Sequence, residues 1–219
     1  MSDRWTIDVW HDPTVTAATD VDHPTRSITH RAAKVVTETF APAVLAALMP
    51  LIIALHVSAD LLTGLGWAAL AVFFSAVIPF GVILLGVRRG QLTDHHIGRR
   101  EQRRKPLLFG LVSVVTGLTL LIVLGAPREL VAMVVVIFGV VLILTVVNMF
   151  WKLSGHAAVA SGSASVLVIM FGPALLAAFA AVAAVGWSRV VLRAHTTTQV
   201  ITGTIAGILI ATPAYLLMA

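Results

Sequence analysis

Apolar and polar residues alternate in long blocks along most of the chain. Seven apolar segments, separated by short polar or turn-forming stretches, cover residues 35–56, 64–87, 107–125, 130–151, 157–171, 173–187 and 197–218. Most of them can cross a bilayer core of about 30 Å as a helix, which takes about 20 residues. The pattern predicts an all-α, polytopic transmembrane helical bundle of about six to seven spans, with six if the first segment lies in the membrane interface.

The fifth and sixth segments are short, so the break between them decides the topology. Gly172-Pro173 lies at this break. Pro starts helices well but interrupts them, and Gly tolerates a left-handed backbone, so the pair predicts a tight turn between two helices. Residues 157–164, just before it, are mostly Ala, Ser and Gly. Such a segment is typical of a helix that packs closely against its neighbours.

The composition agrees with a membrane domain that follows a polar tail. Hydrophobic residues make up 58% of the 219 residues and charged residues 11%, and the mean hydropathy of +0.98 is far above that of an ordinary soluble domain. Residues 1–34 are polar and lack an apolar signal-peptide core. We therefore expect a polar N-terminal tail over 1–34 and a transmembrane domain over 35–219. Because cysteine is absent, the chain has no disulfide, thiolate nucleophile or cysteine metal site.

The distribution of basic residues predicts an orientation. With seven spans, the tail, the 88–106 loop, the 152–156 turn and the 188–196 turn all lie at one membrane face. These pieces hold 14 of the 15 Lys and Arg residues, and only Arg128 falls at the other face. By the positive-inside rule the basic face is cytoplasmic. The formal charge of +5 then indicates anionic lipid headgroups or a phosphorylated substrate as partners, rather than nucleic acid.

Three polar islands interrupt the apolar background, all at this basic face. The first is the 88–106 loop, which carries seven basic and two acidic residues. The second, Lys152-Leu153-Ser154-Gly155-His156, stands just before the fifth segment. Ser154 suits a helix N-cap, and the free amides of a helix start, with Gly155 allowing close approach, make a good anion site. His156 would lie beside that anion.

The third island runs from Ser188 to Gln199 and leads into the last segment. Arg189 can hold a phosphate through its planar guanidinium. His195 and Gln199 are four residues apart, so they share one helical face and Gln199 can reach the imidazole. A histidine oriented in this way by a neighbour is prepared to act as a nucleophile.

These residues resemble the second and third signature motifs of a known superfamily. Ser154-Gly155-His156 is followed about thirty residues later by Ser188-Arg189, five residues and His195. The pattern is similar to that of the type-2 phosphatidic acid phosphatase superfamily, over roughly residues 88–205. Its members are integral-membrane enzymes that dephosphorylate phosphatidic acid, phosphatidylglycerophosphate, prenyl diphosphates and related lipids without a metal.

The resemblance implies a phosphohistidine mechanism. His195 would attack phosphorus, while His156 would protonate the leaving oxygen and later activate water. Arg189, Ser154 and the Gly155 amide would hold the phosphoryl oxygens. Further candidate phosphate-binding residues are Ser188, Lys152, Arg100, Arg103 and Arg104.

The chain departs from the motifs at two less important positions. Leu153 replaces the Pro that is usual before Ser-Gly-His. The first motif, which has Lys, six residues and then Arg-Pro, is not reproduced at Lys105-Pro106, because Gly98 lies seven positions before Lys105. The loop arginines are candidates to substitute for it, and spacing does not choose among them.

The third departure concerns the nucleophile: Gln199 occupies the place of an Asp in the superfamily. A carboxylate fixes the histidine tautomer and also stabilises the imidazolium, whereas an amide oxygen does only the first. We therefore predict one of two arrangements. Either Asp94 approaches His195 from the loop, or the enzyme is slow and Gln199 orients its histidine.

Other interpretations of the polar residues were weighed. The loop histidines, His156, His195 and Asp94 could converge on a metal, but no preset zinc-ligand spacing occurs, and we predict no metal site and no cofactor. The alternative to an enzyme is a non-catalytic lipid-phosphate-binding pseudo-phosphatase or a transporter-like protein. Transporters usually place ionisable groups near mid-membrane, whereas here they cluster at segment ends. The favoured function is a phosphatase of the cell membrane whose lipid substrate carries an isoprenoid or an acyl chain.

Overall fold

The computed structural model describes residues 28–97 and 100–219, and for Arg100 only the backbone. Most of the predicted tail lies outside these residues, and its last part, residues 28–34, forms the start of the first helix. The elements are, in order, α1 (Ile28–Thr39), α2 (Pro42–Val57), α3 (Leu61–Val72), the π-helical turn η1 (Phe73–Val77), α4 (Ile78–Arg88), the 3₁₀ turn η2 (Arg100–Gln102), α5 (Arg104–Val123), α6 (Arg128–Val147), α7 (Gly155–Phe171), the 3₁₀ turn η3 (Pro173–Ala177), α8 (Ala178–Val191) and α9 (Thr197–Met218).

Length and hydropathy identify the helices that can cross a membrane. Within the described residues, five continuous helical stretches qualify, over 61–88, 104–123, 128–147, 173–191 and 197–218. The pair α1 and α2, bent by 45°, forms a sixth candidate, and α7 is a shorter apolar helix of 17 residues. Each predicted apolar segment is thus mainly helical, which confirms the predicted polytopic all-α bundle.

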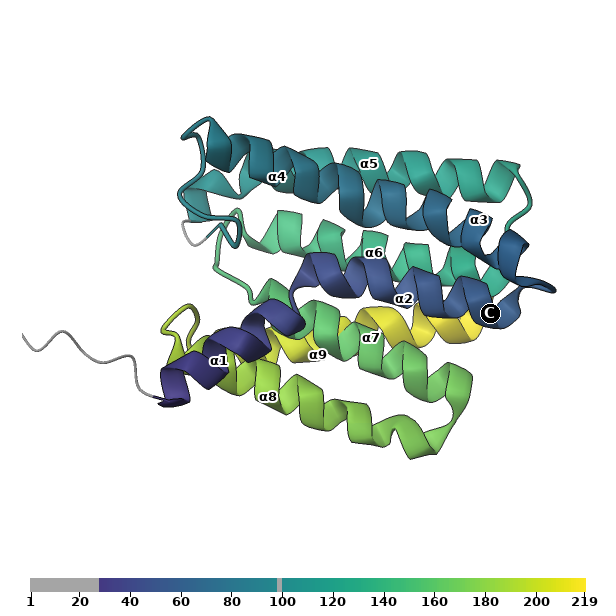
Figure 1. Ribbon diagram of the computed structural model, residues 1–219. Helices are drawn as coiled ribbons and strands as arrows, with labels where there is room; N and C mark the ends of the chain where they lie inside the picture. Colours follow the sequence, from purple (N-terminus) through teal and green to yellow (C-terminus); the bar gives the residue numbers. More distant parts are fainter. Residues whose placement is uncertain (1–27, 98–99) are drawn as a thin grey trace, which may run out of the picture.

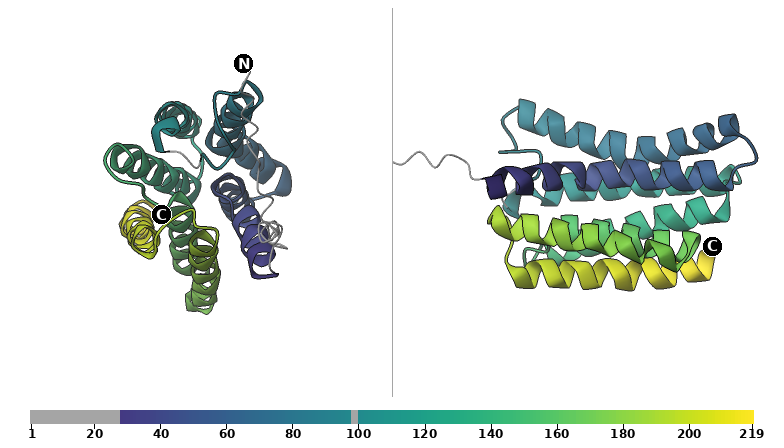
Figure 2. Two further views of the ribbon diagram at one scale, coloured as in Figure 1. Left: turned by 90° about the vertical axis from the view of Figure 1, so that its left-hand side faces the viewer. Right: turned by 60° about the horizontal axis from the view of Figure 1, so that its bottom comes forward.

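The long helices lie side by side along a common direction (Figures 1 and 2). In Figure 1 the 88–106 loop, the start of α7 and the turn between α8 and α9 all lie at the left-hand end of the bundle, and the C-terminus lies at the right-hand end. The three polar islands therefore gather at one end, as the predicted topology requires.

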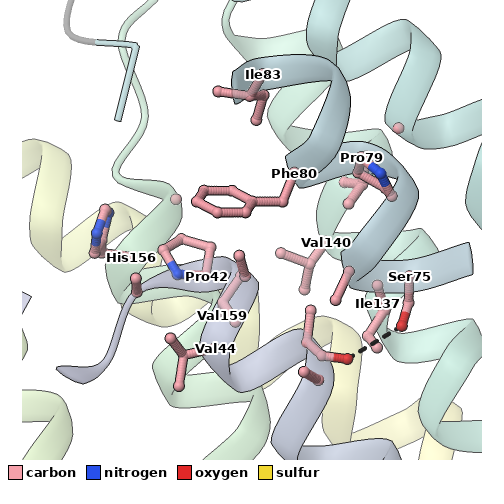
Figure 3. Close-up of a pocket in the computed structure, with 18 of the residues that line it drawn as sticks. Pro42, Val44, Ser75, Pro79, Phe80, Ile83, Ile137, Val140, His156 and Val159 are labelled. Atoms are coloured by element: carbon pink, nitrogen blue, oxygen red, sulfur yellow. Dashed lines mark hydrogen bonds between the residues drawn. The ribbon is translucent and has the colours of Figure 1, made fainter. Parts of the chain in front are cut away.

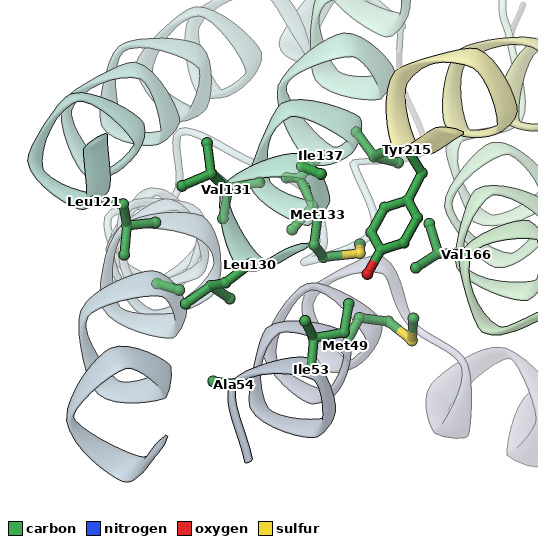
Figure 4. Packing of buried hydrophobic residues seen from close by; sticks show 14 of the residues in the cluster. Met49, Ile53, Ala54, Leu121, Leu130, Val131, Met133, Ile137, Val166 and Tyr215 are labelled. Carbon is green, nitrogen blue, oxygen red and sulfur yellow. The ribbon is translucent and has the colours of Figure 1, made fainter. Parts of the chain in front are cut away.

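A continuous apolar core joins helices from both halves of the chain. Met49 and Ile53 of α2, Leu121 of α5, Leu130 of α6 and Tyr215 of α9 are each at most 2% exposed, and Figure 4 shows several of these side chains packed together. The α2 helix thus anchors the N-terminal half against the helices that carry the second and third islands.

Close packing of α7 against α9 sets the relative position of those two islands. A Cβ on Gly203 of α9 would lie 2.6 Å from the Ser154 carbonyl oxygen, and one on Gly207 would overlap the Ala158 carbonyl oxygen. The Ser161 hydroxyl also donates to the Thr204 carbonyl at 2.9 Å. Small residues let the two backbones approach in this way, which confirms the close packing predicted for residues 157–164.

The break between α7 and α8 has the predicted form. Gly172 ends α7 with φ of +96°, a backbone that strongly favours glycine, and Pro173 begins η3. The chain reverses there, so α7 and α8 are separate antiparallel helices and both of their polar ends return to the same end of the bundle (Figure 1).

Candidate active site

The second island forms the N-terminus of α7. Ser154 is the N-cap, and its hydroxyl accepts a hydrogen bond from the Ala157 amide at 3.4 Å. His156, one residue into the helix, is 6% exposed, and its Nε2 is buried without a hydrogen-bond partner among the described residues. A buried polar nitrogen without a partner is costly, so this atom indicates a place for a ligand.

The third island forms the turn between α8 and α9, and one backbone carbonyl accepts two of the hydrogen bonds that stabilise this turn. The Arg189 carbonyl accepts from the amides of Ala194 at 3.0 Å and His195 at 3.2 Å, and Arg193 has φ of +51°. Thr196 then caps α9, and Gln199 completes a capping box with it. Because α9 begins directly after His195, the imidazole is held at a fixed helix start.

Gln199 determines which nitrogen of His195 carries the proton. Its Oε1 accepts from the Thr196 amide at 3.2 Å and lies 3.1 Å from His195 Nδ1. The Thr196 amide can only donate, so the atom facing it is the amide oxygen, and that same oxygen then requires a proton on Nδ1. The Nε2 nitrogen keeps its lone pair, which is the tautomer that a nucleophile needs.

The backbone joins the second and third islands directly. The Ser154 amide donates to the Gln199 carbonyl at 3.3 Å, and His156 and His195 line the same cavity. The convergence of these two histidines, on which the sequence interpretation depends, is therefore present in the structure.

Arg189 is held by a contact that the sequence did not indicate. It is 5% exposed, its guanidinium reaches the Thr37 hydroxyl of α1 at 3.5 Å, and its Nε is buried without a partner among the described residues. Ser188, predicted to bind phosphate, is fully buried and instead pairs with Thr37 at 3.0 Å and donates to the Val185 carbonyl at 2.7 Å. Ser188 thus supports Arg189 through Thr37, a residue that carries no motif.

Among the loop arginines whose side chains the structure describes, Arg103 forms part of the cavity wall. Its guanidinium donates to the Ile97 carbonyl at 2.8 Å, to Asn148 Oδ1 at 3.1 Å and to the Leu153 carbonyl at 3.3 Å. These bonds fasten the first island to Leu153 of the second island and to Asn148, four residues before that island. His96, which also lines the cavity, lies seven positions before Arg103, the spacing of Lys and Arg in the first superfamily motif. The sequence interpretation missed His96 because it aligned that motif on Lys105-Pro106.

His95 and His96 both reach the carboxylate of Glu38, at the end of α1. Their Nε2 atoms lie 3.3 and 3.1 Å from its two oxygens. The His96 ring is also 5.1 Å from the His156 ring, centre to centre. Glu38 thus stands at the rim of the cavity and not beside His195.

The polar groups create an environment that disfavours positive charge. Burial, followed by the charges of Arg103, Arg189 and Lys152, lowers the pKa of His195 to about 3. Burial also lowers the pKa values of Arg103, Lys152 and His96. His195 is therefore neutral at physiological pH, and an anion would relieve the repulsion among its neighbours.

A cavity of about 950 Å³ connects these polar groups with the apolar interior. His95, His96, Arg103, His156 and His195 line its polar end. Figure 3 shows its wall, in which Phe80 and Ile83 of α4 face Pro42 of α2, and Val140 and Val159 lie beyond. A smaller cavity of about 220 Å³ shares Glu38 and His96 and reaches Arg189.

The other predicted site residues lie in different positions. Gly155 lines the large cavity, whereas Lys152 is half-buried and Arg104 is exposed at the start of α5, and neither lines either cavity. The Arg100 side chain is outside the described part of the chain. Asp94 accepts from the Thr93 hydroxyl at 3.2 Å, and its charge partly offsets the lowering of the pKa of Arg103 and Lys152.

Fold and site together define a polytopic helical protein, with several apolar helices typical of membrane proteins and histidines and arginines around one cavity end. The family model of the PAP2 superfamily matches residues 144–219, which confirms the resemblance predicted from the sequence. The matched segment contains His156, Arg189 and His195. The match supports a phosphoester hydrolase in general, acting on a phosphate-bearing substrate. No curated protein and no solved structure matches the chain significantly.

Proposed function

We propose that the chain is an integral-membrane phosphatase that removes phosphate from a lipid phosphomonoester or diphosphate through a phosphohistidine on His195. The observation that carries the proposal is a pair of buried nitrogens without partners among the described residues, His156 Nε2 and Arg189 Nε. His156 lines the large cavity together with a neutral His195, whose Nε2 keeps its lone pair, and Arg189 lines the smaller cavity, which shares Glu38 and His96 with the large one. A phosphoryl group would satisfy both nitrogens and balance the surrounding positive charge.

In the proposed reaction the Nε2 lone pair of His195 forms a bond to phosphorus as the bond to the lipid oxygen breaks. His156, protonated with the help of the dianionic phosphate, gives its proton to the leaving oxygen. His156 then takes a proton from a water that attacks the phosphorus atom. The phosphorus–nitrogen bond breaks, its electron pair returns to His195 Nε2, and inorganic phosphate is released. Arg189 and the Gly155 amide stabilise the charge on the phosphoryl oxygens.

The shape of the cavity supports a lipid as the substrate. It runs along α6 from Asn148 to Met133, fifteen residues or about 22 Å of helix. Leu48 of α2 and Val77 of η1 line it and are 44% and 53% exposed, so the cavity is open at the side of the bundle. An apolar chain can lie there while the phosphate stays at the polar end.

The test is phosphate release from a panel of lipid phosphates in detergent, with a chelator present. Turnover should fall by at least about 10³-fold in His195→Ala, because the nucleophile is lost, and by about 10²–10⁴-fold in His156→Ala. His56→Ala is the matched control, since this exposed histidine belongs to the far end of α2. With p-nitrophenyl phosphate, whose leaving group needs no proton, His156→Ala should accumulate an acid-labile phosphoenzyme.

Absence of release from every lipid phosphate, together with retained phosphate binding, would instead identify a non-catalytic binder. The amide of Gln199 in place of a carboxylate is the observation that favours this second candidate.

The lipid chain is tested separately. Val44→Trp on α2 should narrow the cavity at its exposed side and raise KM for a long-chain lipid phosphate by about tenfold, without affecting p-nitrophenyl phosphate. Val112→Trp on α5 is the control, because Val112 is exposed but does not line the cavity. Equal effects of Val44→Trp on both substrates would argue against a lipid chain in this cavity.

We further propose that the site faces the cytoplasm, since the Lys and Arg residues that the structure describes belong, apart from Arg128, to the elements and loops at the end of the bundle that holds the site. The C-terminus then lies on the outer side of the cell membrane. A reporter enzyme that works only on that side should therefore be active when it is fused to the C-terminus. Reporter activity in the cytoplasm would reverse the orientation.

A further inference from the structure

A group of metal-binding side chains lies at the cavity rim, outside the proposed catalytic set. Glu38, His95 and His96 each offer one ligand atom, and these atoms all lie within 4.8 Å of one another. The two Nε2 atoms lie 3.3 and 3.1 Å from different oxygens of the one carboxylate. The group joins the end of α1 to the 88–106 loop, parts of the chain more than fifty residues apart.

The spacing of these atoms suits zinc. Tetrahedral zinc holds nitrogen and oxygen ligands at about 2.0–2.2 Å, which places neighbouring ligand atoms about 3.4 Å apart. The 3.3 and 3.1 Å separations involve different oxygens of Glu38, and a set with one atom from each residue lies within 4.8 Å. A tetrahedral ion therefore needs a modest closing of the two imidazoles around one carboxylate oxygen. Two imidazoles and one carboxylate are also a ligand set that zinc sites use, with water or a substrate oxygen in the fourth position.

The site is accessible to an ion from solution. The Glu38 and His95 side chains are 44% and 41% exposed, and His96 is 20% exposed. All three residues line the large cavity, and Glu38 and His96 also line the smaller one. An ion can therefore bind without displacing the apolar core.

We propose that Glu38, His95 and His96 bind one zinc-class divalent metal ion, which fastens the 88–106 loop to α1 at the rim of the cavity. Its role is to hold the loop and, with it, the wall formed by His96 and Arg103. No step of the phosphohistidine reaction passes through the ion. The sequence interpretation expected no metal, and its convergent set of possible ligands did not contain Glu38.

The test is zinc binding to the purified full-length protein without a histidine tag, by calorimetry and by metal analysis after gel filtration. The parent should bind one equivalent. Glu38→Gln and His95→Ala should weaken binding more than about 100-fold, because even partners outside the ligand set cost 10–100-fold. His56→Ala, His195→Ala and a variant lacking His11 and His23, two of the three tail histidines, should bind like the parent. X-ray absorption should report two imidazoles and a carboxylate oxygen.

Thermal unfolding gives a second readout that needs no enzymatic activity. Zinc should raise the apparent Tm of the parent and not that of Glu38→Gln, a variant close in shape whose own folding is checked by the same scan. Zinc binding that survives in Glu38→Gln and His95→Ala, or that disappears in His195→Ala, would overturn the proposal, as would the absence of binding to the parent. Because no arm measures phosphate release, the metal site can fail while the phosphatase stands, and the reverse.

Discussion

The two sides of the candidate site are built in different ways. The side made by α7, α8 and α9 holds His156, Arg189 and His195 through helix starts, one carbonyl that closes α8 and the backbone bond from Ser154 to Gln199. The side made by α1 and the 88–106 loop is held by side-chain bonds, those of Arg103 and those of the two histidines with Glu38. The groups assigned to chemistry thus stand on α7, on α8 and on the turn before α9, all joined by backbone hydrogen bonds. The opposite side supplies charge from a loop that side-chain hydrogen bonds hold in place.

The two sides of the site also differ in whether the family model matches their sequence. The family model covers residues 144–219, which is the rigid side, and stops short of the loop. On the matched side backbone geometry fixes the place of each residue, whereas on the loop side several arrangements of cationic residues can hold the same phosphate.

The largest expected difference between the two sides concerns their arginines. Arg189→Lys should lower kcat by about 10²–10³-fold, because it removes a buried Nε that has no partner among the described residues. Arg103→Lys should cost only about tenfold, since the Arg103 guanidinium is largely occupied by Ile97, Asn148 and Leu153. Initial rates on one lipid phosphate compare them, and equal losses would break the distinction between the sides.

Rigidity itself is tested at the α7–α9 contact. Gly207→Ala should destabilise the protein by about 1–3 kcal/mol, because the added Cβ meets the Ala158 backbone and forces the helices apart. Gly66→Ala on α3 is the control, since a Cβ there meets nothing within 4 Å, and it should be neutral or slightly stabilising. Thermal unfolding in detergent measures both. A Gly207→Ala protein as stable as the parent would show that close packing does not hold the islands together.

Gln199→Asp should move the acid limb of kcat/KM to higher pH by about one unit or more, because a carboxylate beside His195 stabilises its protonated form and raises its pKa. In the parent the pKa of His195 is about 3, so loss of the neutral nucleophile begins only at strongly acid pH. Gln199→Asn has the same length as the aspartate without its charge and serves as control. Dividing kcat/KM of the variant by that of the parent at each pH removes the effect of substrate ionisation. If this ratio does not change with pH, His195 is not the neutral nucleophile.

Asp94→Ala should have the smallest effect, within about twofold in kcat. His195 Nδ1 donates its hydrogen bond to Gln199 Oε1, and the partly exposed Asp94 acts on the loop side only through screened charge. Steady-state rates at two salt concentrations provide the measurement. A loss above about tenfold would revive the prediction that Asp94 orients the nucleophile.

The loop side shows why part of the site could not be predicted. His96 and Arg103 carry the spacing of the first motif, but several arginines compete for that role along the loop, and the bonds of Arg103 to Asn148 and Leu153 join residues about fifty positions apart. Thr37 and Glu38 lie in a helix whose sequence has no motif at all. Ser188 was expected to contact phosphate because of its place in a motif, whereas packing against α1 buries it completely.

The sequence by itself determined the helices, the turn at Gly172, the close packing of the helix that holds residues 157–164 and the gathering of three polar islands at one end. These features follow from hydropathy, from helix-terminal chemistry and from the alternation of direction between successive helices, all of which are local or additive along the chain. Tertiary structure alone decided which polar groups meet: Thr37 with Arg189, Glu38 with both loop histidines, and Arg103 with the residues beside the second island. These contacts depend on how helices far apart in the sequence pack against one another. A single sequence gives no direct information on the distances between such helices.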